Sequence, residues 1–316
     1  MILNSKNFSI ACLFSLALTF LTMLTASAAE KTTILLKSDG DRLEVERLIK
    51  HLLPMSGKRR IEAASRYLLG RYYHPETKKR IKKQTDKPAK KTIKAEATNE
   101  KPLSVEFLRT SMQYLDCMTY VEHVLALANS SKAAYNDEFL CRLIDIMFNS
   151  DGGPLYNHQR SHFTSHWADV NEQKGYLKNV ARHHPMATSR TLFLNKVGKN
   201  RTFYVEDRFM IATQPKMVWY FDRKTVLAGK ADLQSGDILA LVTDKEGLDV
   251  THMAFFIVKN KKKWLRHASL KLNRIVDQDF NQYLKDHESV KGLMVMRPVF
   301  NAKECFKFNF KLQPDK

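Results

Sequence analysis

Residues 115–122, Leu-Asp-Cys-Met-Thr-Tyr-Val-Glu, form the segment that decides the fold and the chemistry expected of this chain. Asp116 is a preferred residue for a helix N-cap, and apolar residues follow it at helical spacing as far as Ala128. We therefore predict a helix that begins at Cys117, with the thiol in its first turn. The helix dipole and the free N–H groups of that turn would stabilise a thiolate and bind an oxyanion. The alternative is that Cys117 is a small buried apolar residue.

Around this segment, helices are expected first and strands later. Helical periodicity is found within 41–70, with a second helix at 61–69 that Gly70 would end, and again at 105–113 and 137–148. The secondary structure of the middle segment, which extends to about residue 230, is ambiguous. Strands are expected at 238–242, 251–258, 263–269 and 293–300, with a hairpin turn at 259–262 and a short helix at 280–284. This order predicts an α+β fold in which N-terminal helices pack on a C-terminal antiparallel β-sheet.

Two histidines on the predicted hairpin are candidate partners for the thiol. A thiolate nucleophile needs a group that holds or moves its proton, usually a histidine oriented by a third group. If residue 252 pairs with 267, or with 269 so that 267 is diagonal to it, His252 and His267 project from the same sheet face. A shift by one residue would put them on opposite faces. Because both strands are otherwise apolar, each histidine has a structural role as its alternative.

The N-terminus has the pattern of a secretory signal peptide. Lys6 precedes an apolar run at residues 10–24, and Ala26-Ser27-Ala28 forms a cleavage site. We expect a signal peptide at residues 1–28 and a single mature domain at 29–316, exported to the periplasm or secreted. A retained N-terminal anchor is the alternative.

The formal charge of +19 favours polyanionic partners. Export makes nucleic acid the least expected of these and leaves an anionic cell wall or membrane surface. Much of the charge lies in a Lys-rich insertion at about 78–101, which has few apolar groups and is expected to be disordered or loosely held. The alternative is that the charge serves only solubility.

Three cysteines remain after removal of the signal. Cys141 and Cys305 are able to form a disulfide, but the sequence does not give their separation. An odd number of cysteines in an oxidising compartment leaves at least one thiol unpaired and reactive.

Other candidate residues have weaker patterns. His158, His162 and His166 would line one face of a helix and offer zinc ligands, although no carboxylate motif accompanies them. A substrate-contacting or solvated face is the alternative. Tyr72, Tyr73 and Trp167 are candidates for packing against a sugar ring or peptide, or are core aromatics. Asp249, three residues before His252, would orient substrate or form a turn.

The cysteine segment, continued by Leu125-Ala126-Leu127-Ala128, resembles the nucleophile helix of the DUF1460 family. Further matches follow in chain order: Leu69-Gly70-Arg71-Tyr72-Tyr73, Arg160-x-His162-Phe163 with Trp167, Gly236-Asp237-Ile238, Gly247-Leu248-Asp249-Val250-Thr251-His252 and His267-Ala268-Ser269. DUF1460 proteins are described as N-acetylmuramoyl-L-alanine amidase-like, in a branch of the papain-like NlpC/P60 hydrolases. Two positions depart from the family pattern, since Tyr72 replaces an expected proline and Ala254 an expected glycine.

The resemblance implies a papain-like NlpC/P60 fold and a cysteine amidase with Cys117 as nucleophile, His252 as general base and His267 as third member. It implies substrate contacts from Tyr72, Tyr73, Arg160, His162, Trp167 and Asp249. The implied substrate is peptidoglycan or a soluble muropeptide, cleaved between the muramic lactyl group and L-alanine. No metal or organic cofactor is implied. A stem-peptide endopeptidase acting between D-Glu and diaminopimelate, and a catalytically silent wall-binding module, are the alternatives.

Overall fold

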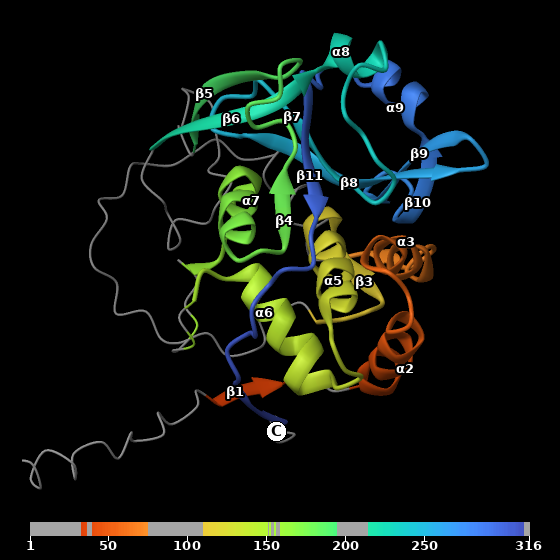
Figure 1. The fold of residues 1–316 in the computed structure, drawn as a ribbon, viewed down its shortest axis with the longest axis vertical. Coiled ribbons are helices and arrows are strands. Elements are labelled where there is room, and N and C mark those ends of the chain that lie inside the picture. Colours follow the sequence, from red (N-terminus) through yellow and green to blue (C-terminus); the bar gives the residue numbers. More distant parts are fainter. Residues whose placement is uncertain are drawn as a thin grey trace, which may run out of the picture.

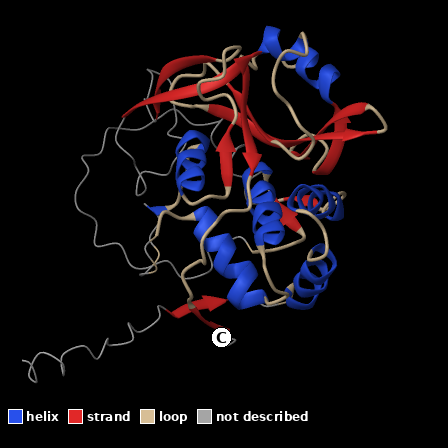
Figure 2. Cartoon of the chain, in the orientation of Figure 1, coloured by secondary structure: helices blue, strands red, loops and turns tan. Residues whose placement is uncertain are grey.

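The computed structural model describes residues 33–36, 40–74, 110–150, 152, 155, 159–194 and 214–312. These residues form a mixed α+β structure with seven α-helices, one π-helix and a ten-stranded sheet. In Figures 1 and 2, helices α2, α3, α5 and α6 gather at one end of the molecule, and α8 and α9 lie at the opposite end beside the sheet. The predicted signal peptide and the Lys-rich insertion lie outside the described residues. Within the described part, no helix is both long and apolar enough to cross a membrane.

The helices, in chain order, are α2 (Arg42–Leu52), α3 (Gly57–Tyr67), α5 (Cys117–Asn129), the π-helix η3 (Tyr135–Leu140), α6 (Cys141–Met147), α7 (Thr164–Gln173), α8 (Arg223–Leu227) and α9 (Phe280–Asp286). Helix α5 is the central one, because all its residues from Thr119 to Ala128 are buried. The predicted helices at 41–70, 116–128 and 137–148 are confirmed, the last as η3 followed by α6. The helix expected at 105–113 is wrong for residues 110–113, which are not helical, and 105–109 lie outside the described residues.

The strands are β1 (Thr33–Leu36), β2 (Tyr72–Tyr73), β3 (Tyr114–Leu115), β4 (Leu177–Asn179), β5 (Thr188–Leu194), β6 (Gln214–Asp222), β7 (Ile238–Val242), β8 (Val250–Lys259), β9 (Lys262–Ser269), β10 (Arg274–Asp279), β11 (Gly292–Pro298) and β12 (Asn309–Leu312). The large sheet has the order β3-β2-β10-β9-β8-β7-β11-β6-β5, with β4 paired to β11. Its pairings are antiparallel except β2–β3, so the predicted antiparallel C-terminal sheet is confirmed.

Side chains alternate along the central strands and build a core on each face of the sheet. In β8, Met253 and Phe255 belong to the core that contains α5, whereas Ala254 and Phe256 belong to the core that contains Phe280 of α9. The predicted hairpin turn is confirmed at residues 260–261, between β8 and β9. These alternating faces fix which side chains of the hairpin meet α9.

A disulfide joins Cys141 at the start of α6 to Cys305 near the C-terminus, with 5.9 Å between their Cα atoms. It connects segments 164 residues apart in the sequence. The remaining described cysteine, Cys117, is a free, half-buried thiol. The pairing that the sequence left open is therefore made, and the free thiol lies at the N-terminus of α5.

Candidate active site

The position of Cys117 is fixed by a capping box at the start of α5. The backbone N–H of Thr119 donates to Asp116 Oδ1 at 2.9 Å, and the N–H of Asp116 donates to Thr119 Oγ1 at 2.8 Å. The predicted N-cap role of Asp116 is confirmed, and Cys117 is the first residue of the helix. Its thiol therefore lies beside backbone N–H groups that have no partner within the helix.

The thiol of Cys117 also meets strand β8. Pairing of β8 with β9 ends at Phe255–Arg266, and beyond it Met253 hydrogen-bonds to the thiol through its backbone. The pKa of Cys117 is raised to about 12: burial and then Asp116 raise it, against backbone hydrogen bonds from Met253, Met118 and Cys117 itself, which lower it. The helix terminus thus acts in the expected direction, but burial outweighs it. Burial therefore favours the neutral thiol.

His252 and His267 lie on one face of the sheet, the face that carries α9. The pairing of Phe255 with Arg266 puts position 252 level with 269 and diagonal to 267, which is one of the two predicted arrangements. His252 Nε2 lies 2.7 Å from His267 Nδ1, and the two rings meet edge to face at 4.8 Å. The sequence expectation that both imidazoles share a face is confirmed.

Gln278 of β10 extends this pair into a chain of three side chains. Its Oε1 lies 2.7 Å from His267 Nε2. An amide oxygen only accepts hydrogen bonds, so His267 carries its proton on Nε2 and presents Nδ1 as an acceptor. His252 must then donate from Nε2, which leaves its Nδ1 unprotonated. The three residues together select the tautomer of His252 that is able to take a proton at Nδ1.

Burial favours the neutral form of both histidines. The pKa of His252 is lowered to about 3, first by burial and then by His267 and His287, against Asp116, which raises it. Burial also lowers the pKa of His267, against the hydrogen bond that His267 donates to Gln278, which raises it. Since Asp116 affects both Cys117 and His252, the helix cap and the imidazole share one electrostatic environment.

Aromatic residues surround the thiol and the histidines. Tyr73 is buried, and its pKa is raised by burial and then by Cys117. Tyr283 of α9 packs edge to face on His267 at 5.3 Å, and burial followed by Cys117 raises its pKa to about 12. His287 stacks on Tyr283 at 4.0 Å. Tyr73 was a predicted site residue; Gln278, Tyr283 and His287 were not, because no local pattern marks them.

Tyr72 points away from Tyr73, as alternation requires, and lies on β2, next to the edge strand β3 of the sheet. It stacks on Tyr114 of β3 at 6.0 Å, and the two residues are 51% and 44% exposed. Tyr72 pairs with Arg274, two residues along β10 from Val276, which pairs with His267. Tyr72 and Tyr114 therefore share the sheet face of His267.

Asp249 and Trp167 are buried in the framework beside the site. Asp249 accepts hydrogen bonds from the backbone N–H of Ser165 at 2.6 Å and of Val250 at 2.8 Å. Through these bonds Asp249 joins the first turn of α7 to the start of β8. His252 lies two residues further along that strand than Val250, its first residue. Trp167 is 0% exposed. These contacts give both residues a supporting role.

Arg160 is held by the protein itself. Its guanidinium donates to Glu122 Oε2 at 2.8 Å and to the backbone oxygen of Met147 at 2.9 Å. Glu122 is fully buried, and burial raises its pKa to about 7 against the lowering effect of Arg160. The guanidinium is thus used in an ion pair with α5, the helix that carries Cys117.

The three histidines considered as metal ligands do not share a helix face. His166 lies in α7, which begins at Thr164, whereas His162 precedes that helix and is half-buried. His158 lies outside the described residues. The prediction that these histidines line one helix face, on which the zinc alternative rested, is therefore wrong.

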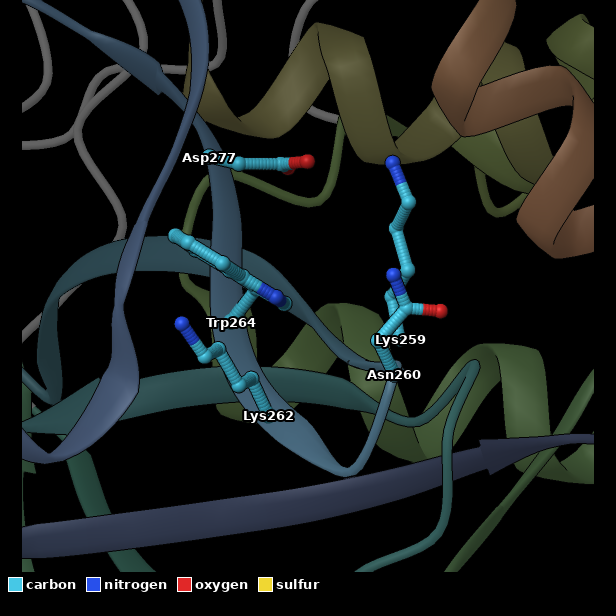
Figure 3. Close-up of a pocket in the computed structure, with 5 residues that line it drawn as sticks. All are labelled: Lys259, Asn260, Lys262, Trp264 and Asp277. Atoms are coloured by element: carbon cyan, nitrogen blue, oxygen red, sulfur yellow. The ribbon is translucent and has the colours of Figure 1, made fainter.

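A pocket of about 330 Å³ opens elsewhere, at the far end of the β8–β9 hairpin (Figure 3). Its lining residues are Lys259, Asn260, Lys262, Trp264 and Asp277. Trp264 and His267 are separated by an odd number of positions on β9 and so point to opposite faces. This pocket is distinct from the Cys117 site, whose assignment rests on the hydrogen-bonded side chains described above.

Comparisons with known proteins identify the family and the fold. The model of the AmiA-like family, described as N-acetylmuramoyl-L-alanine amidase-like, matches residues 89–292. A DUF1460 protein from Legionella pneumophila is similar in structure, with a TM-score of 0.61, 19% identity and coverage of 84% of this chain and 97% of that one. An N-acetylmuramoyl-L-alanine amidase from Bacteroides uniformis has a TM-score of 0.58, 22% identity and coverage of 77% and 99%. These structures show a shared fold.

No curated protein matches the chain. The family match includes Cys117, His252, His267 and Gln278, and it spans both the helix and the strands that bring them together. The chain belongs to the AmiA-like, N-acetylmuramoyl-L-alanine amidase-like family.

Proposed function

We propose that this protein is a papain-like cysteine amidase of the NlpC/P60 type that hydrolyses the bond between the muramic lactyl group and L-alanine in peptidoglycan or its fragments. The observation that carries the proposal is the chain from His252 to His267 and Gln278, next to Met253, whose backbone bonds to the free thiol at the N-terminus of α5. This arrangement contains a nucleophile, a base and an orienting group. Membership of an amidase-like family supports the choice of an amide substrate.

In the proposed reaction, His252 Nδ1 takes the proton of Cys117 as the thiolate attacks the lactyl carbonyl carbon. Backbone N–H groups at the start of α5 stabilise the oxyanion. His252 then gives its proton to the nitrogen of L-alanine, and the peptide leaves as an amine. Water attacks the thioester with His252 again as the base, which releases the lactyl carboxylate and restores the thiol. His267, held by Gln278, supports the charge that forms on His252.

The substrate contacts in this proposal come from Tyr73 beside the thiol and from the exposed Tyr72. Arg160, Trp167 and Asp249 are not proposed as substrate contacts. Arg160 and Asp249 use their polar groups in hydrogen bonds within the protein, and the ring of Trp167 is buried.

Mass spectrometry of a digested disaccharide-tetrapeptide tests the bond. The expected products are free disaccharide and intact tetrapeptide, and Cys117→Ala should yield neither. Disaccharide-dipeptide with a diaminopimelate-containing fragment would instead indicate the endopeptidase. No cleavage of any muropeptide by the folded protein would favour a silent wall-binding module.

We also propose that the chain is exported. The Cys141–Cys305 disulfide supports this, because structural disulfides persist mainly in oxidising compartments. N-terminal sequencing of protein from a periplasmic or secreted fraction is expected to begin near Ala29. Recovery of intact Met1 from the cytoplasm would contradict the proposal.

A further inference from the structure

The pocket at the end of the β8–β9 hairpin combines an aromatic ring with fixed charges. Lys259 pairs with Lys262, and Trp264 pairs with both Ile257 and Asp279. Ile257 and Asp279 are each two residues from a pocket residue on the same strand, Lys259 and Asp277. The side chains of Lys259, Lys262, Trp264 and Asp277 therefore share the sheet face opposite to His267. In the view of Figure 3, the indole of Trp264 lies between Asp277 and Lys262, and Lys259 and Asn260 stand across from it. All five side chains border one volume of about 330 Å³.

The charges of this pocket are unbalanced. Lys259 and Lys262 are directly opposite each other across the last pair of the hairpin, where like charges repel. Within the described part of the chain, neither ammonium group forms an ion pair with a carboxylate. Asp277 does not compensate them, because Arg266 binds both of its oxygens at 2.7 and 2.8 Å. A bound anion would relieve this repulsion.

The remaining groups suit a sugar ring. Trp264 is half-buried against the core and keeps one part of its ring toward the pocket, where it offers an apolar surface to a flat, weakly polar molecule. Asp277 is held in one orientation by Arg266 and keeps acceptor capacity for hydroxyl groups. Asn260 adds an amide at the rim.

We propose that this pocket is a second carbohydrate site that binds a pyranose ring carrying a carboxylate. The ring packs on Trp264, the carboxylate lies between Lys259 and Lys262, and Asp277 accepts from hydroxyl groups. The cleavage proposed above would expose a lactyl carboxylate on each muramic acid, so its glycan product has this chemistry. The relation between this pocket and the glycan product rests on the proposed function, whereas the proposed binding site itself does not.

Isothermal titration of N-acetylmuramic acid into the Cys117→Ala protein tests the site without turnover. N-acetylglucosamine is the neutral comparison, and inorganic phosphate is the comparison for simple anion binding. Saturable binding of N-acetylmuramic acid, at least about tenfold tighter than either comparison, is expected. Equal affinity for N-acetylglucosamine would overturn recognition of the carboxylate, and equal affinity for phosphate would overturn recognition of the ring.

Variants locate the binding. Trp264→Ala and the double substitution Lys259→Gln with Lys262→Gln should each weaken it by about tenfold, whereas Trp264→Phe should retain most of it. The double substitution Lys224→Gln with Lys230→Gln removes the same charge from exposed positions at α8 and should change nothing. Circular dichroism shows whether each variant is folded. Unchanged binding in the folded hairpin variants, or lysine-dependent binding to anionic lipid vesicles without binding of the sugar, would overturn the proposal.

Discussion

His252 Nε2 and His267 Nδ1 lie 2.7 Å apart, and the proton between them belongs to His252. The reason lies in the next hydrogen bond of the chain, in which Gln278 Oε1 accepts the proton of His267 Nε2. An acceptor at the end of the chain sets the direction of each hydrogen bond before it. His252 is therefore held in the tautomer that the proposed base requires by a residue that is not itself titratable.

Substitution of Gln278 tests this relationship. In Gln278→Leu, His267 is free to adopt the other tautomer and to present an N–H to His252, so kcat/KM should fall by about tenfold to a hundredfold. Gln278→Glu retains an acceptor and should keep more activity than Gln278→Leu. The exposed Gln282 of α9, which bonds Asp286, provides the control Gln282→Leu with unchanged activity. Equal activity of Gln278→Leu and the parent would show that the tautomer is set by another group.

The pKa shifts of the two reacting groups lead to a prediction about the free enzyme. The pKa of Cys117 is raised to about 12 and that of His252 is lowered to about 3, so both groups are neutral between these values. The rate of alkylation of Cys117 by iodoacetamide should then rise with pH throughout the range from 6 to 10, because only the thiolate reacts. The rate is measured by mass spectrometry of the labelled peptide. A plateau already reached at about pH 6 would indicate a preformed thiolate–imidazolium pair.

The helix of Cys117 and the histidine hairpin could be predicted because local signals define both. Asp116 and the apolar spacing fix the start of α5, and the Lys-rich turn between two mostly apolar segments fixes β8 and β9. The prediction that His252 and His267 share one sheet face then followed from one assumption about the register of the hairpin. By contrast, Gln278, Tyr283 and Tyr114 reach the site through pairings and helix placement that no local pattern encodes. Arg160 and Asp249 were predicted as substrate contacts from a motif, whereas tertiary packing uses their charges within the protein.

Arg160→Ala is predicted to affect stability more than substrate binding. It would leave Glu122, which is 0% exposed, without its cation, and removal of one partner from a buried pair costs about 3–5 kcal/mol. The free energy of unfolding is measured in urea. The control is Arg182→Ala, because Arg182 pairs with Asp169 and Glu172 at the surface and should contribute about 0–1 kcal/mol. A stable Arg160→Ala variant with a raised KM would restore the predicted substrate contact.

The Cys141–Cys305 disulfide is predicted to support stability without taking part in catalysis. A disulfide that closes a long loop restricts the unfolded chain, so its loss should lower the free energy of unfolding by about 2–5 kcal/mol. The double substitution Cys141→Ala with Cys305→Ala should melt at a lower temperature and keep its kcat/KM below that temperature. Loss of activity in this variant while it is folded would instead give the disulfide a role in the reaction.

The stacked tyrosines at the sheet edge are predicted to bind the sugar that precedes muramic acid in a disaccharide substrate. Tyr114 is three residues before Cys117, so the Cα atoms of the two residues are at most about 11 Å apart. Tyr72 stacks on it at 6.0 Å and stands where the family resemblance leads us to expect proline, so this surface is a feature of this chain.

Tyr72→Ala and Tyr114→Ala should therefore lower kcat/KM for a disaccharide-peptide by about tenfold, and change it little for the same peptide on muramic acid alone. The comparison of two substrates separates loss of a sugar contact from damage to Cys117, which would reduce both rates equally. Tyr67→Ala is the matched control, because Tyr67 is also 44% exposed but lies on α3 under Arg71. If both substrates slow to the same extent, the tyrosine pair acts on the position of Cys117 through β3 and not on the glycan.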